Sequence, residues 1–435
     1  MIIINRNQIE KIKRLSKEGG VIVLGQIIAV IGSLVLVKVL TKYISPIEYG
    51  ELSLALTLGT LICQVSMSGV MPGIFRFYPI AEENEELPLF FNASKQLMIY
   101  GTIITLALGS FLLISAFFLG FQKWISITLI SIIVIQLGSY NSSMSNIQNA
   151  ARQRGIVAFH GGLDSWLKIL LALTIMYFFG NTVKSVLLSY VLVAIIILIS
   201  QFFFLKKLIP INNKNGSSYK LLMKSMWNYS KPFAIFNLFT WAQASSDRWA
   251  LGYFSNTENV GFYALLLQLG YTPITMGIGL LNNFLAPILH QRSGDAMDST
   301  RNSKVRSITN QLTMVCLIFT FVIFFCTLIL HKWIFSILVG AEYQSISYLF
   351  PWILLAGGFF AAGQVVTMKV MSDMKTSSLI WPKLITSIIG VTFNFAGVFF
   401  GGLVGLVIAA ISFSILHFLW LFKVSQNIKS DTILI

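Results

Sequence analysis

The chain has 435 residues, of which 56% are hydrophobic and 11% are charged, whereas a soluble domain carries about 25% charged residues. The mean hydropathy is +0.78, so there is too little polar surface for soluble domains and too much apolar content for a disordered chain. The composition predicts a polytopic membrane protein. In such a protein the net charge of +15 indicates basic cytoplasmic loops, and we expect no nucleic-acid partner.

A hydrocarbon core about 30 Å thick needs roughly 20 apolar residues in a helix. By that measure the fold class is an all-α polytopic membrane protein with twelve transmembrane helices. The predicted spans, in chain order, are 20–42, 50–77, 93–119, 122–148, 157–179, 182–205, 231–254, 257–289, 307–331, 345–370, 377–400 and 402–423.

Lys and Arg residues are distributed unevenly between the two sets of loops. If the N-terminus is cytoplasmic, most of them face the cytoplasm, and the outer loops hold Lys42, Lys123, Lys184 and Lys332. An excess of Lys and Arg marks the cytoplasmic side of a membrane protein. We therefore expect both termini to be cytoplasmic.

The chain contains an internal repeat. The segment Tyr43-Ile-Ser-Pro-Ile-Glu-Tyr-Gly50 is similar to Tyr253-Phe-Ser-Asn-Thr-Glu-Asn-Val-Gly261, and Trp166-Leu-Lys168 to Trp381-Pro-Lys383, each about half a chain later. Halves of six spans share one orientation, so their substrate binds between them near the midplane, and rocking of the halves alternates access. The predicted domains are a basic cytoplasmic N-terminus (1–19), an N-lobe (20–205), a basic cytoplasmic linker (206–230), a C-lobe (231–423) and a cytoplasmic tail (424–435).

Polar side chains recur at helical spacing in two equivalent spans. Span 50–77 carries Ser53, Thr57, Thr60, Gln64 and Ser68, and span 257–289 carries Gln268, Thr272, Thr275, Gly279 and Asn282. The Ser and Thr positions fit either a cavity lining or ordinary helix packing. The amides cost more in lipid, so we expect Gln64, Gln268 and Asn282 to line a shared cavity.

Charged residues inside spans are the most informative feature, because each costs about 2.5–3.5 kcal/mol at the bilayer centre on insertion scales. The cations repeat between the halves, with Lys38 equivalent to Arg248 and Lys168 to Lys383. They predict a hydrated cavity that attracts an anion, since Arg in particular suits phosphate. The predicted substrate-binding residues are Arg248, Lys168, Lys383, Lys38, Arg76, Gln64, Gln268 and Asn282.

Two acids, Asp247 and Asp164, are the candidate ion-coupling residues. Alternatives remain open for these charges. Lys38, Arg76 and Arg248 are within reach of an interface and could snorkel. Asp164 could simply neutralise Lys168 one helical turn away, and Asp247 could compensate Arg248.

Two segments resemble a known family. The run Asp247-Arg248-Trp-Ala-Leu-Gly-Tyr-Phe-Ser-Asn-Thr-Glu-Asn-Val-Gly261-Phe-Tyr-Ala264 looks like the signature between spans seven and eight of bacterial polysaccharide flippases. Lys42-Tyr-Ile-Ser-Pro-Ile-Glu-Tyr-Gly50-Glu-Leu-Ser-Leu-Ala55 looks like their signature between spans one and two. The chain therefore resembles the O-antigen (Wzx-type) branch of the multidrug/oligosaccharidyl-lipid/polysaccharide (MATE-like) exporter superfamily, with two six-helix lobes around a cationic lumen.

The resemblance implies a flippase of the bacterial plasma (inner) membrane. Its substrate would be an undecaprenyl-pyrophosphate-linked oligosaccharide, an O-antigen or capsule repeat unit, moved from the inner to the outer leaflet. It further implies contact with membrane lipid, a coupling proton or sodium ion, and a polysaccharide polymerase and chain-length regulator as partners.

Three other functions compete with the flippase. An ion-coupled multidrug exporter of the same superfamily would need acids in its lumen to bind organic cations. A membrane-embedded polymerase usually presents a large outer loop, and the predicted outer loops here are short. An acyltransferase is weakly indicated by His160-Gly-Gly-Leu-Asp164, whose His–Asp spacing is one residue short. No zinc-ligand spacing or Gly-rich phosphate loop occurs in the sequence, so we expect no enzyme activity, cofactor or bound metal.

Overall fold

The computed structural model describes residues 6–209, 218–293, 298–372 and 380–427, with some side chains inside helices, including that of Asn282, outside the described part. The chain divides into two compact units. The first unit comprises Met1–Ile44 and Glu51–Trp241, and the second comprises Ser45–Gly50 and Ala242–Ile435. Every regular element in the described ranges is helical, which agrees with a chain that must satisfy its backbone polar groups within lipid.

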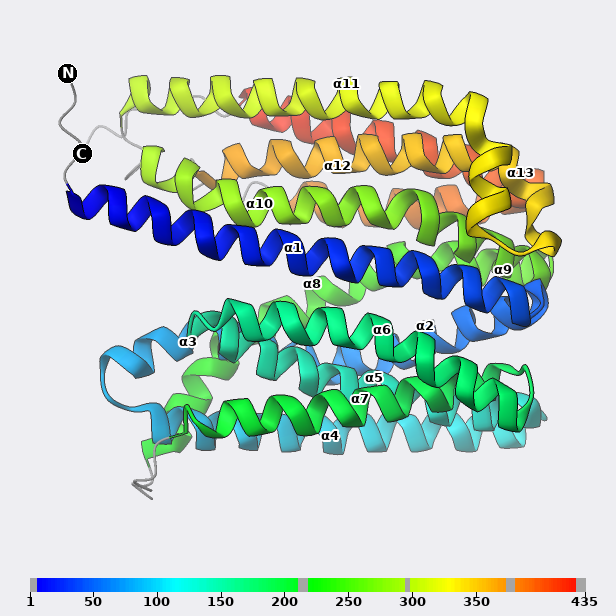
Figure 1. Cartoon of the computed structure of the whole chain (residues 1–435), viewed down its shortest axis with the longest axis horizontal. Coiled ribbons are helices and arrows are strands. Elements are labelled where there is room, and N and C mark those ends of the chain that lie inside the picture. Colours follow the sequence, from blue (N-terminus) through cyan, green and yellow to red (C-terminus); the bar gives the residue numbers. More distant parts are fainter. Residues whose placement is uncertain (1–5, 210–217, 294–297, 373–379, 428–435) are drawn as a thin grey trace. The chain divides into compact units, whose positions relative to one another are not determined.

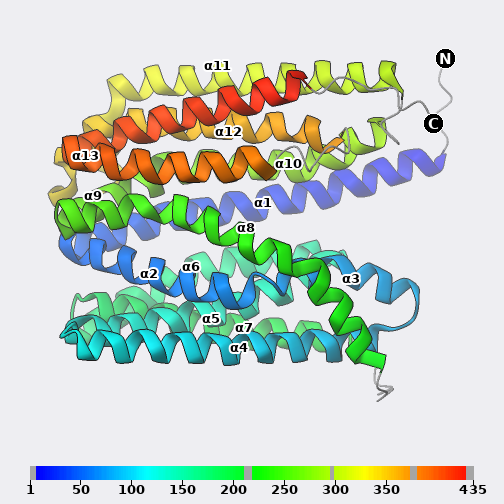
Figure 2. The same cartoon turned by 180° about the vertical axis from the view of Figure 1, so that it is seen from behind.

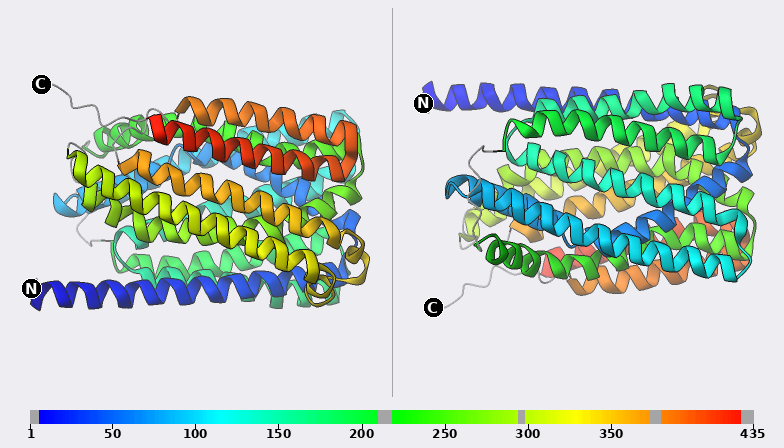
Figure 3. Two further views of the ribbon diagram at one scale, coloured as in Figure 1. Left: turned by 90° about the horizontal axis from the view of Figure 1, so that it is seen from above. Right: turned by 90° about the horizontal axis from the view of Figure 1, so that it is seen from below.

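The first unit is a set of long helices, most of them apolar. They are α1 (Arg6–Tyr43), α2 (Pro46–Met67) from Glu51 on, α3 (Met71–Glu83), α4 (Leu87–Phe118), α5 (Gln122–Ala150), α6 (Arg154–Phe179), α7 (Val183–Lys206) and the first part of α8 (Ser218–Phe254). Helices α4 to α7 lie side by side (Figure 1 and Figure 3). Helix α1 packs on α6 through small residues: a Cβ at Gly25 would lie 2.5 Å from the Ala158 side chain. Such residues allow close helix packing in membranes.

The second unit contains the remaining helices. They are the end of α8, α9 (Thr257–Leu266), the π-helical turn η1 (Leu267–Tyr271), α10 (Thr272–Ser293), α11 (Ser299–Leu338), the 3-10 helix η2 (Ala341–Leu349), α12 (Phe350–Ser372) and α13 (Ile380–Asn427). Within α13, Gly402 has φ 55° and ψ −135°, a conformation that favours glycine. Gly402 divides α13 into two helical segments, called limbs here, and Figure 2 shows that they run in opposite directions.

The protein is a multi-pass membrane protein. Nine helical stretches in the described residues are long and apolar enough to cross a bilayer. From residue 380 on, predicted spans 377–400 and 402–423 fall in one of these stretches, since both continue in α13. Predicted spans 231–254 and 257–289 lie in α8 and in α9–α10, which are not among the nine. The all-helical membrane class is therefore confirmed, and the count of twelve spans stays a prediction.

Two predicted segments differ in detail from the structure. The span predicted over 50–77 is interrupted, because α2 ends at Met67 and α3 begins at Met71. Gly69, in the interruption, lies against the indole of Trp227, and a Cβ there would come within 2.9 Å of the ring. Pro72 in the first turn of α3 suits a helix start, since it has no backbone N–H to leave unbonded. In the predicted linker 206–230, α8 already begins at Ser218.

The repeated segments contact each other reciprocally within the second unit. A Cβ added to Gly50 would collide with the carbonyl oxygen of Thr257, and a Cβ added to Gly261 would collide with the carbonyl oxygen of Pro46. Each glycine thus lies against the residue four positions before the other glycine. The two helix starts cross at a separation that only glycine permits, and both glycines are buried.

We predict that Gly50→Ala and Gly261→Ala each destabilise the protein. The added methyl group would push apart two backbones, and overpacking of this kind costs about 1–3 kcal/mol or more. Thermal unfolding of the purified protein in detergent should show a lower midpoint for both variants. Gly138→Ala in α5 is the matched control, because a Cβ there meets nothing within 4 Å. Equal midpoints for all three variants would contradict the close crossing.

Candidate functional site

The charged pair in α8 lies in the second unit. Asp247 is 6% exposed, and its Oδ1 accepts hydrogen bonds from the backbone N–H of Arg248 at 2.7 Å and from Nε of Arg248 at 3.3 Å. Nη2 of Arg248 donates to the carbonyl oxygen of Ala244 at 3.0 Å. Nη1 has no hydrogen-bond partner among the described residues. Arg248 is thus compensated by its neighbour and keeps one edge of its guanidinium group for another acceptor.

The residue before this pair links α8 to α13. Nδ2 of Asn394 donates to Oγ of Ser246 at 2.8 Å, and both residues are buried. The Asp247 carboxylate also interacts electrostatically with the phenols of Tyr263, which is buried, and Tyr271, which is partly buried. The interior of the second unit is therefore polar around Asp247.

The charged pair in α6 lies in the first unit. Nζ of Lys168 is 2.7 Å from Oδ2 of Asp164, four residues earlier on the same helix, and it lies 5.4 Å from the ring centre of Tyr190 in α7. Both side chains of the ion pair are about one-third exposed, at 29% and 34%. The helical pair expected as one alternative does form, so Lys168 presents a positive charge that an acid already partly offsets.

His160 lies one turn before Asp164 on α6 and contacts α7. Its Nδ1 lies 2.8 Å from the carbonyl oxygen of Ile156, and its Nε2 lies 3.0 Å from Oγ of Ser200. Both ring nitrogens are satisfied by structural partners. His160 is thus a packing residue, which leaves the His–Asp pair of an acyltransferase without an available imidazole.

The other predicted cations differ in exposure. Lys38 in α1 and Lys383 in the first limb of α13 are partly buried, whereas Arg76 in α3 is exposed. Lys383 interacts electrostatically with His417, a buried residue in the second limb of α13. Lys38 and Lys168 belong to the first unit and Arg248 and Lys383 to the second.

Much of the polar stripe of α2 is satisfied by helix packing. The hydroxyl groups of Thr57 and Thr60 donate to carbonyl oxygens of their own helix, at 2.6 and 2.8 Å. Nε1 of Trp241 in α8 donates to the carbonyl oxygen of Thr57 and to the hydroxyl of Thr60, both at 3.2 Å. This arrangement favours the packing interpretation of the Thr positions. The side chains of Gln64 and Gln268 are partly buried, and that of Asn282 lies outside the described residues.

A buried polar network that the sequence did not predict joins α2, α4 and α5. The hydroxyls of Ser66 and Thr105 are 2.6 Å apart, and Thr105 also donates to Oε1 of Gln136 at 2.9 Å. Nε2 of Gln136 donates to Thr102 at 3.2 Å, and Thr102 bonds to Tyr140. A single Gln inside a span was the available sequence signal, but its partners come from other helices.

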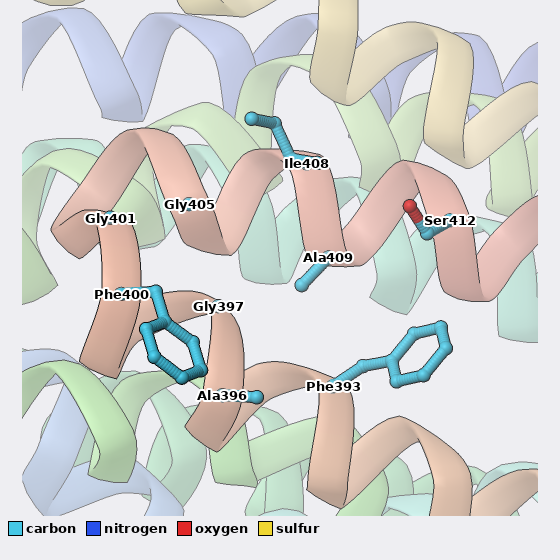
Figure 4. Close-up of a pocket in the computed structure, with 9 residues that line it drawn as sticks. All are labelled: Phe393, Ala396, Gly397, Phe400, Gly401, Gly405, Ile408, Ala409 and Ser412. Atoms are coloured by element: carbon cyan, nitrogen blue, oxygen red, sulfur yellow. The ribbon is translucent and has the colours of Figure 1, made fainter.

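The limbs of α13 enclose a groove of about 480 Å³. Figure 4 shows Phe393 and Phe400 on the first limb and Ile408 and Ser412 on the second. Ser412 supplies the one side-chain hydroxyl in this lining. The groove is therefore unsuited to a charged headgroup. No group of three or more His, Cys, Asp or Glu residues that could hold a metal ion occurs among the described residues.

Solved structures of similar fold define the class of protein. An inward-facing multidrug resistance MATE family transporter of the MOP superfamily is 13% identical, with a TM-score of 0.63 over 93% of this chain and 96% of that chain. A MATE transporter of Vibrio cholerae is 12% identical, with a TM-score of 0.60 over 95% and 97%. The lipid II flippase MurJ, in an inward closed conformation, is 12% identical, with a TM-score of 0.61 over 93% and 87%. This protein therefore has the fold of MOP-superfamily transporters and flippases.

The family follows from sequence. The family model described as "Polysaccharide biosynthesis protein" matches residues 15–291, more than half of the chain, so the chain belongs to that family. A comparison with the curated proteins found no match. The predicted membership in a polysaccharide family is confirmed, and the fold is the one predicted from the resemblance to the MATE-like superfamily.

The α6 pair allows a test of whether Lys168 binds an anion or only balances Asp164. If its role is to bind substrate, Lys168→Met should abolish transport whether or not Asp164→Asn is also present. If its role is local neutralisation, the double variant should recover most of the activity that the single variant loses. Complementation of a flippase-null strain, with membrane abundance measured in parallel, distinguishes the two. Recovery of complementation in the double variant would show that Lys168 does not bind substrate.

Proposed function

We propose that this protein is a flippase for an undecaprenyl-pyrophosphate-linked oligosaccharide. It moves an O-antigen or capsule repeat unit from the inner to the outer leaflet of the bacterial plasma membrane, by alternating access of two lobes around a cationic central cavity. The observation that carries the proposal is Arg248, whose guanidinium group lies in the predicted span 231–254 and has one N–H edge without a hydrogen-bond partner among the described residues. Membership in the polysaccharide biosynthesis family supports the chemistry of the substrate.

The proposed architecture has twelve spans in two six-helix lobes, 20–205 and 231–423, with both termini in the cytoplasm. Three observations support it. The kink at Gly402 divides α13 where two of the predicted spans meet. Helix α8 and the pair α9–α10 have lengths compatible with crossing a bilayer. The positive-inside distribution of Lys and Arg supports the orientation.

The pyrophosphate would be held by cations from both lobes. In the proposal, Arg248 and Lys383 contact it from the C-lobe and Lys38 and Lys168 from the N-lobe, with Arg76 near the cytoplasmic entrance. Arg suits phosphate because its planar fork donates two parallel hydrogen bonds. Gln64, Gln268 and Asn282 would bond to the sugar, whose hydroxyl groups need both donors and acceptors. The isoprenoid tail would remain in membrane lipid.

Asp247 and Asp164 are the proposed ion-coupling residues. Asp247 is buried, its carboxylate is hydrogen-bonded to Arg248, and it interacts electrostatically with Tyr263 and Tyr271. A proton or sodium ion at Asp247 would compete with Arg248 for the carboxylate, and the guanidinium group would then be released toward an anion. A polysaccharide polymerase and a chain-length regulator are the proposed protein partners.

A multidrug exporter of the same superfamily is the second candidate, because two of the similar structures are MATE transporters. An organic cation would need an uncompensated acid in the lumen. Asp247, Asp164 and Glu51 are each paired with a cation in the described structure, respectively with Arg248, Lys168 and Lys123. These pairs favour the flippase over the drug exporter.

We predict that Arg248→Ala abolishes complementation of a flippase-null strain while membrane abundance stays normal. Arg248→Lys keeps the charge and loses the two-pronged geometry, so it should retain partial function if charge alone matters and none if a bidentate contact is needed. Surface polysaccharide is the readout. Arg152→Ala, a basic position in the connection between α5 and α6, is the control for a general loss of positive charge. Normal surface polysaccharide in Arg248→Ala would contradict the cationic binding site.

We also predict that Asp247→Asn weakens ion coupling. The amide keeps the shape of the carboxylate but cannot bind a coupling cation with the same charge. In proteoliposomes, transport by the variant should respond less than the wild type to an imposed proton or sodium gradient. An unchanged response in the variant would show that the coupling ion binds elsewhere.

A further inference from the structure

His417 occupies an unusual position in the second limb of α13. It is 4% exposed, and its ring lies nearly parallel to that of Phe360 in α12, at 4.9 Å between ring centres and an interplanar angle of 16°. Phe413, one turn earlier, lies at 5.7 Å and 25°. Gly363 of α12 adds a close backbone contact, since a Cβ there would lie 3.2 Å from Cδ2 of His417.

Neither ring nitrogen of His417 has a hydrogen-bond partner among the described residues, and both are closed off from solvent. His160 and His331, by contrast, each bond to a serine hydroxyl. A buried polar atom without a partner costs about 1–3 kcal/mol. Phenylalanine would fill the same stacked position without that cost. The property that imidazole adds here is therefore its ability to take up and release a proton.

The two limbs of α13 are in contact in this region, since a Cβ on Gly390 would lie 3.0 Å from the ring of Phe413, one turn before His417. Lys383, two turns before Gly390 on the facing limb, interacts electrostatically with His417. The residues that the ring contacts, Phe360 and Gly363 of α12 and Phe413 of the second limb, are not ionisable. Further away, Tyr271 lies 5.6 Å from the ring of Phe360, and Lys369 of α12 donates to the carbonyl oxygen of Ser425. Lys383 is partly exposed, whereas the nitrogens of His417 are not. A phosphate group can thus approach Lys383, but it cannot reach His417 directly.

We propose that His417 is a proton-binding site whose occupancy is linked to anion binding at Lys383. The inference rests on the proposed function, in which Lys383 contacts the pyrophosphate. Two positive charges side by side repel strongly where water is scarce. A phosphate on Lys383 offsets that repulsion, so the anion favours a proton on His417. By thermodynamic reciprocity, a proton on His417 then tightens the binding of the anion by the same factor.

This linkage has a mechanistic consequence for the C-lobe. When the anion leaves Lys383, the proton on His417 is destabilised and is released. With the proton bound, the site that holds the pyrophosphate carries less net negative charge than the pyrophosphate alone. This lowers the free-energy cost of moving the pyrophosphate through a low-dielectric interior. The proton at His417 acts in addition to any ion at Asp247.

The test is the pH dependence of binding of undecaprenyl pyrophosphate to the full-length protein in lipid nanodiscs. For the wild type, affinity should rise as the pH falls through the range in which His417 takes up its proton, by at most about tenfold per pH unit for one linked proton. His417→Gln should lack this component. The phosphates of the probe also titrate, so the readout is the difference between the two proteins. His331→Gln, in α11 of the same unit, is the matched control and should follow the wild type.

Two further measurements keep the test decisive. His417→Phe preserves the aromatic stacking, and at the high-pH end, where imidazole is neutral, both His417 variants should bind the probe as tightly as the wild type does. Lys383→Gln should weaken binding and flatten the same pH component. Identical pH profiles for the wild type and a folded His417 variant would overturn the linkage alone. Failure of the wild type to bind undecaprenyl pyrophosphate at any pH would overturn the proposed function and the linkage with it.

Discussion

A charge inside a membrane-crossing helix must find compensation within a few ångströms, because lipid offers neither water nor counter-ions. This constraint organises the polar interior of both units. Arg248 has Asp247 beside it, Lys168 has Asp164 one turn away, and the Glu51 carboxylate, which is mostly buried, has Lys123. A partly exposed cation that already has a local acid is stable without substrate, and in the proposed function it would transfer part of its bonding to the phosphate.

The same constraint distinguishes polar residues that could bind a ligand from polar residues that only hold helices together. Hydroxyl groups on α2 return to carbonyl oxygens of their own helix or accept from Trp241. The network around Gln136 closes on neighbouring hydroxyls. These polar groups form their hydrogen bonds within their own helix or with neighbouring helices. They therefore make helix packing specific, and they present no free surface to a ligand. The imidazole of His417 is among the buried polar groups that have no hydrogen-bond partner in the described structure, and the guanidinium group of Arg248 keeps one edge beyond its bonds to Asp247 and Ala244.

Close helix contacts set where those groups lie. Gly50 and Gly261 allow two equivalent helix starts to cross with backbones in contact, and Gly25 allows α1 to approach α6. Stacking of His417 on Phe360 likewise depends on Gly363, which has no side chain to keep α12 away from α13. Small residues thus determine which long side chains come into contact. Those contacts in turn determine which charged and polar groups interact.

The membrane class, the helical content and the family could be predicted from the sequence, because they follow from apolar length and local motifs. Helix boundaries were predicted only in part: α1 begins at Arg6 and α8 at Ser218, well before the predicted span starts at 20 and 231. The sequence also identified both ion pairs as possible, since i to i+4 and adjacent pairs lie within one helix. Tertiary structure alone decided that α2 ends at Met67, where Gly69 meets Trp227 of α8, and that Thr57 and Thr60 serve helix packing. It alone also revealed His417, because the absence of a hydrogen-bond partner depends on which side chains of distant helices surround the ring, and no local pattern encodes those neighbours.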